Sequence, residues 1–139
     1  MGIAHVAQVA HLEGSCFADP WSERSIATEL DNPLSLWLVA INEDRVVGYV
    51  GSQTVLDASD MMNIAVDPSH RREGIAEALV AALIEGLLQR GSHSLTLEVR
   101  SSNEPAKALY EKLGFCQVGC RKNYYRNPKE DAWIMQKNF

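Results

Sequence analysis

The segment at residues 63–76 constrains the fold most strongly, because a strand, a tight basic turn and a long helix follow one another within it. A short apolar strand ends at Asp67-Pro68, and a helix begins near Gly74. Unpaired N–H groups at a helix N-terminus and the positive end of the helix dipole both favour anions. Gly74 also lets the backbone approach a ligand where a Cβ atom would clash. The turn at residues 71–76 therefore predicts a site for an anion such as a pyrophosphate.

The helix after this turn has the most regular pattern in the chain. Apolar residues recur at every fourth position and a second apolar row flanks them, which predicts a helix over residues 74–90 with one buried face. Gly91 is a typical stop for such a helix. The two rows are Ile75, Leu79, Leu83 and Leu87, and Ala76, Val80, Ile84 and Leu88.

The other elements follow from periodicity and from turn residues. Apolar stripes and caps predict helices at 5–16, at 22–30, and from Ser102 or Asn103 to Gly114. Apolar and alternating runs predict strands at 36–41, 46–55, 61–66, 95–99, 115–121 and 132–136. This order predicts a single α/β (α+β) domain over residues 1–139, with a central mixed, mostly antiparallel sheet flanked by helices.

The composition excludes several classes of protein. A chain of 139 residues with 46% hydrophobic residues fits one compact domain. The net charge of −5 argues against general nucleic-acid binding, and no apolar run approaches the roughly 20 residues that a membrane span needs. The chain has 3 cysteines without a disulfide framework and no signal-peptide pattern, which indicates a cytoplasmic protein. Its cysteines and histidines show no metal-ligand spacing.

The second half of the chain carries another motif. Residues 97–115 read L-x-V-x-x-x-N-x-x-A-x-x-L-Y-x-x-x-G-F, and residues 71–76 fit R/Q-x-x-G-x-G/A. With these motifs the chain resembles the GNAT acetyltransferases over nearly its whole length, in order and at the family's spacing. Within that family, the segments at 16–22, 63–66, 97–100, 122–125 and 130–132 resemble the ribosomal-protein-alanine N-acetyltransferases (RimI type).

The resemblance implies acetyl-CoA as the co-substrate and assigns residues to it. The strand at Ile64, Ala65 and Val66 is expected to splay and to pair with the pantetheine arm, with the Val66 N–H facing the thioester oxygen. Asn103 is expected to bind the same arm, to cap its own helix, or to do both. The turn is expected to hold the pyrophosphate mostly through its backbone, although its arginines could equally form a solvated basic turn. The turn residues are Arg71, Arg72, Glu73, Gly74, Ile75 and Ala76.

Two residues are expected to carry the chemistry. Acyl transfer to an amine needs a neutral amine and a proton for the leaving thiolate. By the resemblance, Glu98 is the general base, acting directly or through water; the alternative is an ion-paired carboxylate, with Arg100 as a candidate partner. Tyr110 is the general acid, because a phenol with a reference pKa of about 10 stays protonated at neutral pH. The alternative for Tyr110 is a packing aromatic.

The acceptor is assigned by the same resemblance. Trp21, Ser22, Tyr124 and Tyr125 are expected to border the acceptor groove; they could also be ordinary core or surface residues. The implied function is direct transfer of acetyl to the N-terminal α-amine of a protein, the alanine of a small-subunit ribosomal protein. Two alternatives stay open: the same chemistry on a small-molecule amine or lysine side chain, and a non-catalytic acyl-CoA-binding regulatory module. No metal, nucleic-acid or membrane partner is expected.

The beginning of the sequence departs from the family pattern. The chain opens directly on its first predicted helix, so the usual N-terminal strand is missing or truncated. Loss of an edge strand leaves its neighbour unpaired and exposed. Either the fold tolerates a sheet without that edge, or Met1 is an internal start within a longer natural chain; because of the exposed edge, we expect the second.

Overall fold

The elements of the chain occur in the order that the sequence predicts: two helices, three strands, a helix, a strand, a helix and two strands. A computed structural model describes all 139 residues. Short 3-10 turns precede α1 and α3, at Ile3–His5 and Pro68–His70. The helices are α1 (Val6–Cys16), α2 (Glu23–Glu29), α3 (Ile75–Gln89) and α4 (Glu104–Lys112). The strands are β1 (Ser35–Asn42), β2 (Arg45–Val55), β3 (Ala58–Val66), β4 (Ser94–Arg100), β5 (Cys116–Tyr125) and β6 (Glu130–Asn138).

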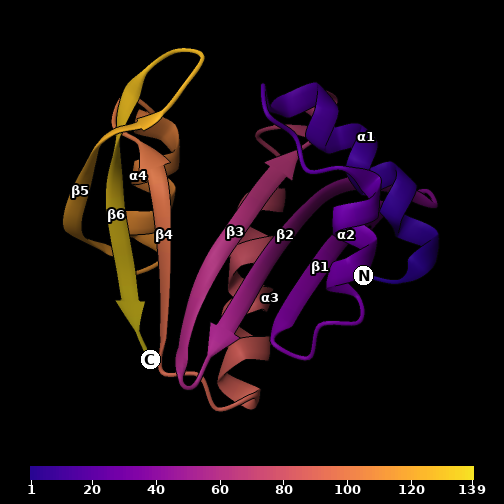
Figure 1. Cartoon of the computed structure of the whole chain (residues 1–139), viewed down its shortest axis with the longest axis horizontal. Helices are drawn as coiled ribbons and strands as arrows, with labels where there is room; N and C mark the ends of the chain where they lie inside the picture. The colour runs from indigo at the N-terminus through magenta and orange to yellow at the C-terminus, as the bar shows by residue number, and fades with distance from the viewer.

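The six strands form one sheet in the order β1-β2-β3-β4-β6-β5 (Figure 1). Neighbours pair antiparallel except for β3 and β4, which are parallel. The prediction of a mixed, mostly antiparallel sheet is therefore confirmed. No strand precedes α1, so β1 forms one edge of the sheet, and the amino group of Met1 donates to the carbonyl of Trp37 at that edge.

The sheet divides between β3 and β4. These strands pair only where residues 58–60 of β3 meet residues 94–96 of β4, and then they diverge, as the V-shaped opening in Figure 1 shows. The pairing of β2 with β3 shifts register at the same level, because Gly51 opposes Asn63 while Ser52 opposes Met61. One extra residue, Met62, is thus inserted into β3, and such a bulge bends the strand that carries it. The splay was predicted for the strand at residues 64–66, whereas β3 and β4 already stop pairing after Asp60, just before the bulge.

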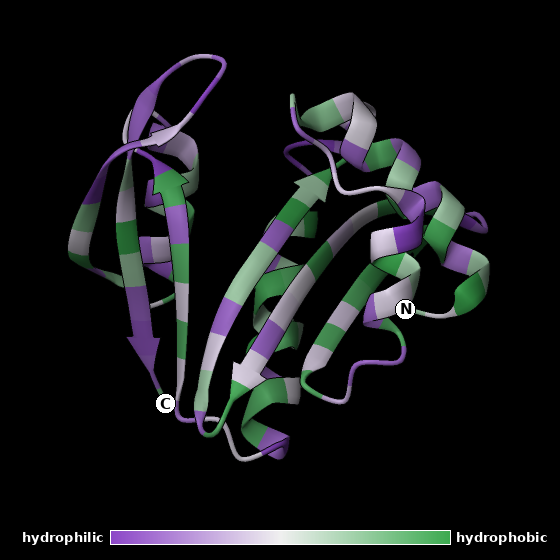
Figure 2. Cartoon of the chain, in the orientation of Figure 1, coloured by the Kyte–Doolittle hydropathy of each residue, from purple (hydrophilic) through white to green (hydrophobic).

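Two hydrophobic clusters lie on opposite faces of the sheet. α3 and α4 cover one face, where Leu83 and Leu97 are fully buried and Tyr110 joins them. α1 and α2 cover the other face near β1 and β2, around Val9 and Tyr49. Figure 2 shows α3 as mostly hydrophobic and the loop between β5 and β6 as hydrophilic. None of the helices combines the length and the apolar character that a membrane crossing requires.

Local sequence explains most of the element boundaries. The Ser22 hydroxyl accepts from the Ser25 N–H and caps α2, and the Asn103 side chain accepts from the Ala106 N–H and caps α4. Both closing strands are longer than predicted, because Tyr125 of β5 pairs with Glu130 of β6 and the end of β6 continues to pair with β4. Leu88 was predicted on the buried face of α3 and is 47% exposed, so the second apolar row ends before it.

Gly51 illustrates how tightly the face under α1 and α2 is filled. A Cβ atom at this position would lie 2.3 Å from the indole of Trp37, which stacks on Tyr49 with ring centroids 6.0 Å apart. We expect Gly51→Ala to destabilise the protein by about 1–3 kcal/mol, because the buried ring must shift to admit the methyl group. Chemical denaturation measures this loss. Gly14→Ala is the control, because nothing lies within 4 Å of the added Cβ there.

Candidate active site

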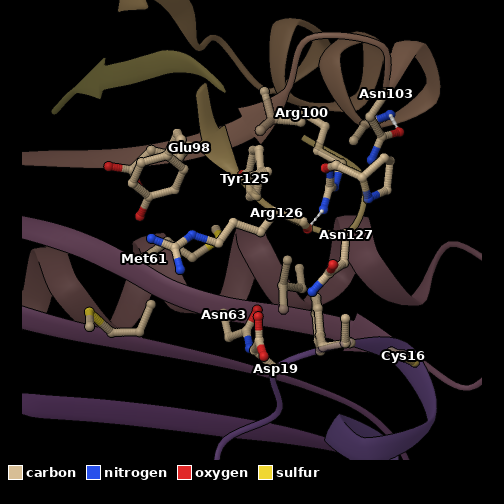
Figure 3. Close-up of a pocket in the computed structure, with 18 of the residues that line it drawn as sticks. Cys16, Asp19, Met61, Asn63, Glu98, Arg100, Asn103, Tyr125, Arg126 and Asn127 are labelled. Carbon is tan, nitrogen blue, oxygen red and sulfur yellow. Dashed lines mark hydrogen bonds between the residues drawn. The ribbon is translucent and has the colours of Figure 1, made fainter. Parts of the chain in front are cut away.

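A cleft of about 860 Å³ lies between the diverging strands β3 and β4. Figure 3 shows Asn63 and Asp19 on one wall, and Glu98, Arg100 and Asn103 on the other. Residues from five segments line it: Cys16, Phe17, Ala18 and Asp19 after α1; Met61, Met62, Asn63 and Ile64 of β3; Glu98, Val99 and Arg100 of β4; Asn103, Ala106 and Tyr110 of α4 and its cap; and Tyr124, Tyr125, Arg126, Asn127 and Pro128 at the end of β5 and beyond.

Glu98 faces this cleft because β4 alternates strictly. Leu97 and Val99 point into the core, so Glu98 between them points to the opposite face. Burial raises the pKa of the Glu98 carboxyl above its ordinary value and nearby Asp60 adds to the rise, while Arg121 opposes it. Arg121 Nε lies 3.4 Å from Glu98 Oε1. A carboxylate with a raised pKa binds a proton more readily, which suits a general base.

The ion-pair partner predicted for Glu98 is wrong: Glu98 lies next to Arg121 and not Arg100. Arg100 does not pair with Glu98; its guanidinium lies 3.3 Å from Glu130 Oε1 instead. Successive strand residues on one face are two apart, but a long side chain can lean along the strand toward another partner. The Arg121 side chain is 57% exposed, so its contact with Glu98 lies at a solvated edge and leaves the carboxylate open to the cleft.

Tyr110 brings a phenol to the same cleft from α4. Its ring packs edge-on against Phe115 with centroids 5.7 Å apart, and the residue is 5% exposed. Burial raises the pKa of the Tyr110 phenol to about 12, which keeps it protonated at neutral pH. The hydroxyl has no hydrogen-bond partner in the chain, yet it is not enclosed by protein. The packing role and a free proton donor therefore coexist in one side chain.

Tyr124 and Tyr125 line the cleft from the end of β5. The two rings meet edge-on with centroids 5.1 Å apart, and the Arg100 guanidinium lies 4.4 Å from the centroid of the Tyr125 ring. Arg100 also donates to the carbonyls of Arg126 and Pro128, at 3.1 and 2.9 Å, and so fastens the loop after β5 to β4. The structure thus brings both predicted tyrosines into the cleft lining.

The backbone of β3 beyond the splay is suited to a ligand that pairs like a strand. Ile64, Ala65 and Val66 pair with β2 on one side and have no strand partner on the β4 side. Ile64 also lines the cleft. An extended amide-bearing chain such as pantetheine can hydrogen-bond to an open strand edge of this kind. The edge therefore fits the predicted place of the pantetheine arm.

The turn before α3 leaves a row of donors without partners. No backbone N–H between Arg71 and Glu77 donates to another group in the chain, and the first helical bond there runs from the Ala78 N–H to the Gly74 carbonyl. Arg72 and Gly74 have φ of 65° and 78°, so the turn winds in the left-handed region. Consecutive N–H groups in such a turn form a concave anion site at the positive end of the helix. The donors fit a pyrophosphate.

The side chains of this turn contribute less than its backbone. Arg71 Nε lies 3.4 Å from the Val66 carbonyl, so this arginine folds back on β3. Arg72 and Glu73 are exposed, and Glu73 lies 3.4 Å from His70 Nδ1. Ile75 and Ala76 are half-buried at the start of α3.

Gly74 is required by its backbone conformation rather than by crowding. Its φ of 78° lies in the left-handed region, and no atom of the chain lies within 4 Å of a Cβ built on it. We expect Gly74→Val to weaken acetyl-CoA binding about tenfold, because a β-branched residue moves the turn out of this region and misaims its N–H groups. Calorimetric titration measures the affinity. Gly91→Val is the control, because it makes the same change at a left-handed glycine that follows α3 and lies outside the turn.

Some predicted residues lie elsewhere. Trp21 packs edge-on against Trp37, with centroids 5.4 Å apart, and does not line the cleft. Ser22 is exposed and caps α2, away from the lining. A contact of either with the acceptor stays a prediction. Asn103 caps α4 with its oxygen and also lines the cleft, so its amide nitrogen is available to a ligand.

Sequence reasoning missed several lining residues and one buried charge. Asn63 is a polar residue within an apolar strand, and Glu13 is an acid on the apolar face of α1; each breaks the pattern around it and could have been noticed. Glu13 is fully buried. Asp19 and Arg126 lie in loops, where periodicity gives no signal. Within the chain, no group of three His, Cys, Asp or Glu side chains is placed to hold a metal ion.

Known proteins resemble this chain in sequence and in structure. The model of the Acetyltransferase (GNAT) family matches residues 6–115. The chain is 41% identical over 127 residues to a ribosomal protein bS18-alanine N-acetyltransferase of Escherichia coli (strain K12), covering 90% of this chain and 85% of that protein. It is 38% identical over 133 residues to the protein of the same name from Haemophilus ducreyi, covering 94% and 87%. A crystal structure of the Escherichia coli enzyme superposes with a TM-score of 0.90 at 37% identity, covering 99% of this chain and 90% of that one.

Proposed function

This chain belongs to the GNAT family of acetyltransferases, and we propose that it acetylates the N-terminal alanine of the small-subunit ribosomal protein bS18, with acetyl-CoA as donor. The observation that carries the proposal is the 41% identity to an enzyme of that name over 90% of the chain. The cleft supports it, because exposed Tyr124 and half-buried Tyr125 line it and offer aromatic surface to an extended peptide. We propose that residues 1–139 act as one catalytic unit.

The proposed reaction is a direct attack. The neutral α-amine of the peptide attacks the thioester carbonyl carbon, the C–N bond forms and the C–S bond breaks. Glu98 takes a proton from the amine, directly or through water, and Tyr110 gives its proton to the leaving thiolate. The Val66 N–H donates to the thioester oxygen as it gains negative charge. An α-amine has a reference pKa of about 7.7–8.0, so the base needs to remove only a weakly held proton.

The test is acetyl transfer by the purified chain, followed by mass spectrometry. One acceptor is a peptide with the N-terminal sequence of bS18; the others are the same peptide with a blocked α-amine, a lysine-containing peptide and a panel of small amines. Acetylation of the free α-amine alone supports the proposal. Turnover of a small amine or a lysine alone contradicts the peptide assignment, and binding of acetyl-CoA without any turnover supports a regulatory module.

A further inference from the structure

The buried carboxylate of Glu13 contacts Asn63, one of the residues that line the cleft. Glu13 of α1 is fully buried, and its Oε1 accepts from the hydroxyl of Tyr49 and from Nδ2 of Asn63. Its Oε2 accepts from the Trp21 N–H at 2.9 Å. A buried charge is costly unless hydrogen bonds satisfy it, and these three donors come from β2, β3 and the segment between α1 and α2. Nothing in the proposed chemistry uses Glu13.

The pairing with Glu13 fixes which way the Asn63 amide points. A carboxylate can only accept hydrogen bonds, so the NH₂ end of the amide must face it. The opposite end, Oδ1, is therefore turned away from Glu13. This oxygen accepts no hydrogen bond in the chain, and it is not among the buried atoms that lack a partner. Because Asn63 lines the cleft, Oδ1 is an open acceptor in its wall.

The position of Asn63 relates this acceptor to the reaction. Asn63 follows the bulge at Met62 and precedes the open edge at Ile64, and it lies on the wall across from Glu98 in Figure 3. An amine that reaches a thioester held along β3 must pass between these two walls. Hydrogen bonds in a chain polarise one another, so the Glu13 charge strengthens Oδ1 as an acceptor.

We propose that Asn63 Oδ1 accepts a hydrogen bond from the acceptor amine and that Glu13 is the positioning residue that holds it there. The inference rests on the proposed function, because it takes a peptide α-amine as the acceptor. An amine offers two N–H donors besides the lone pair that attacks carbon. Asn63 binds one N–H while Glu98 receives the other proton, so that the lone pair points at the thioester.

The test compares steady-state kinetics of variants on the bS18 peptide. Asn63→Ala is expected to raise the peptide KM about tenfold, the size expected when a hydrogen bond to a charged or strongly polar partner is lost. The acetyl-CoA Kd is expected to stay within about twofold of wild type, because the variant keeps the β3 backbone. Gln53→Ala is the matched control. The side-chain amide of Gln53, on β2, also donates to a carboxylate, that of Glu29, but Gln53 does not line the cleft.

A double-mutant cycle separates positioning from general damage. Glu13→Gln is expected to raise the peptide KM in the wild-type background, because the NH₂ end of the new side chain opposes the Trp21 N–H or Asn63 Nδ2. The same change is expected to add little to Asn63→Ala, because the oxygen it positions is already gone. If Glu13→Gln does not fold, Asn63→Ala and its control decide alone.

Each result discriminates. Wild-type protein without turnover of the peptide overturns the proposed function and this inference with it. Wild-type turnover with an Asn63→Ala KM within about twofold of wild type overturns the inference alone. If Glu13→Gln raises the peptide KM by the same factor in the Asn63→Ala background as in wild type, the two residues act independently. That result overturns the positioning role of Glu13 and leaves the Asn63 contact in place.

Discussion

Glu98→Gln is expected to lower kcat on the peptide about 100-fold near pH 7, the lower end of the range for loss of a general base. The glutamine keeps the shape of the side chain but cannot take the proton. In wild-type protein, kcat/KM is expected to rise with pH as Glu98 loses its proton, at a pH above the ordinary glutamate pKa, because burial raises the pKa of this carboxyl. Steady-state assays of kcat and kcat/KM across the pH range measure both effects.

The pH profile of Glu98→Gln tests whether Glu98 is the general base. Without the base, the proton that the attacking amine releases as the C–N bond forms must pass to solvent, and this transfer becomes easier as the pH rises, so the rising limb moves to higher pH and the defect shrinks at high pH. Acetyl-CoA affinity is expected to stay close to wild type, because the carboxylate does not face the turn before α3. Glu85→Gln on the exposed face of α3 is the control. A variant with full activity at every pH contradicts the base assignment.

Tyr110→Phe is expected to lower kcat about 100-fold, because the thiolate then leaves without a proton from the enzyme. The ring and its contact with Phe115 stay, so the melting temperature changes little. The wild-type phenol has a pKa raised to about 12 by burial, so its protonated form persists throughout the working range and this group sets no falling limb below pH 10.

The leaving group offers a direct test of this role. An acyl donor whose thiol has a lower pKa needs less help to depart, so the Tyr110→Phe defect is expected to shrink with such a donor. The Glu98→Gln defect is expected to stay, since the amine still needs its base. A Tyr110→Phe defect of equal size with every donor indicates that the phenol positions the donor rather than protonating it.

The elements and much of the site were predictable from local patterns. The apolar rows of α3 placed that helix within one residue at each end. Ser22 marked the start of α2, and of the two predicted caps for α4, Ser102 and Asn103, the structure uses Asn103. Strict alternation in β4 placed Glu98 on the face away from the core. The motif around Tyr110 placed a tyrosine on α4, and the structure brings it to the cleft with Glu98. These features depend on neighbours in sequence, so periodicity and capping chemistry reveal them.

The contacts between distant segments were not predictable in the same way. Arg100 pairs with Glu130 and fastens the loop after β5, whereas Glu98 meets Arg121. Trp21 packs on Trp37 and lies outside the cleft lining. Each of these pairings depends on the register of strands that are far apart in the chain, and a shift of one residue exchanges the two faces of a strand.

The sequence by itself determined the family, the order of the elements, and the strand, turn and helix that offer an anion site. Each of these depends on the spacing of residues that lie close together in the chain. Only the tertiary structure decided where the sheet opens. The bulge at Met62 and the early end of β3–β4 pairing create the cleft, and the burial of Glu13 against Asn63 sets the direction of one amide in its wall. Those outcomes depend on packing and burial in three dimensions: a carboxylate that is solvated in the unfolded chain must find donors from other segments once the core closes around it.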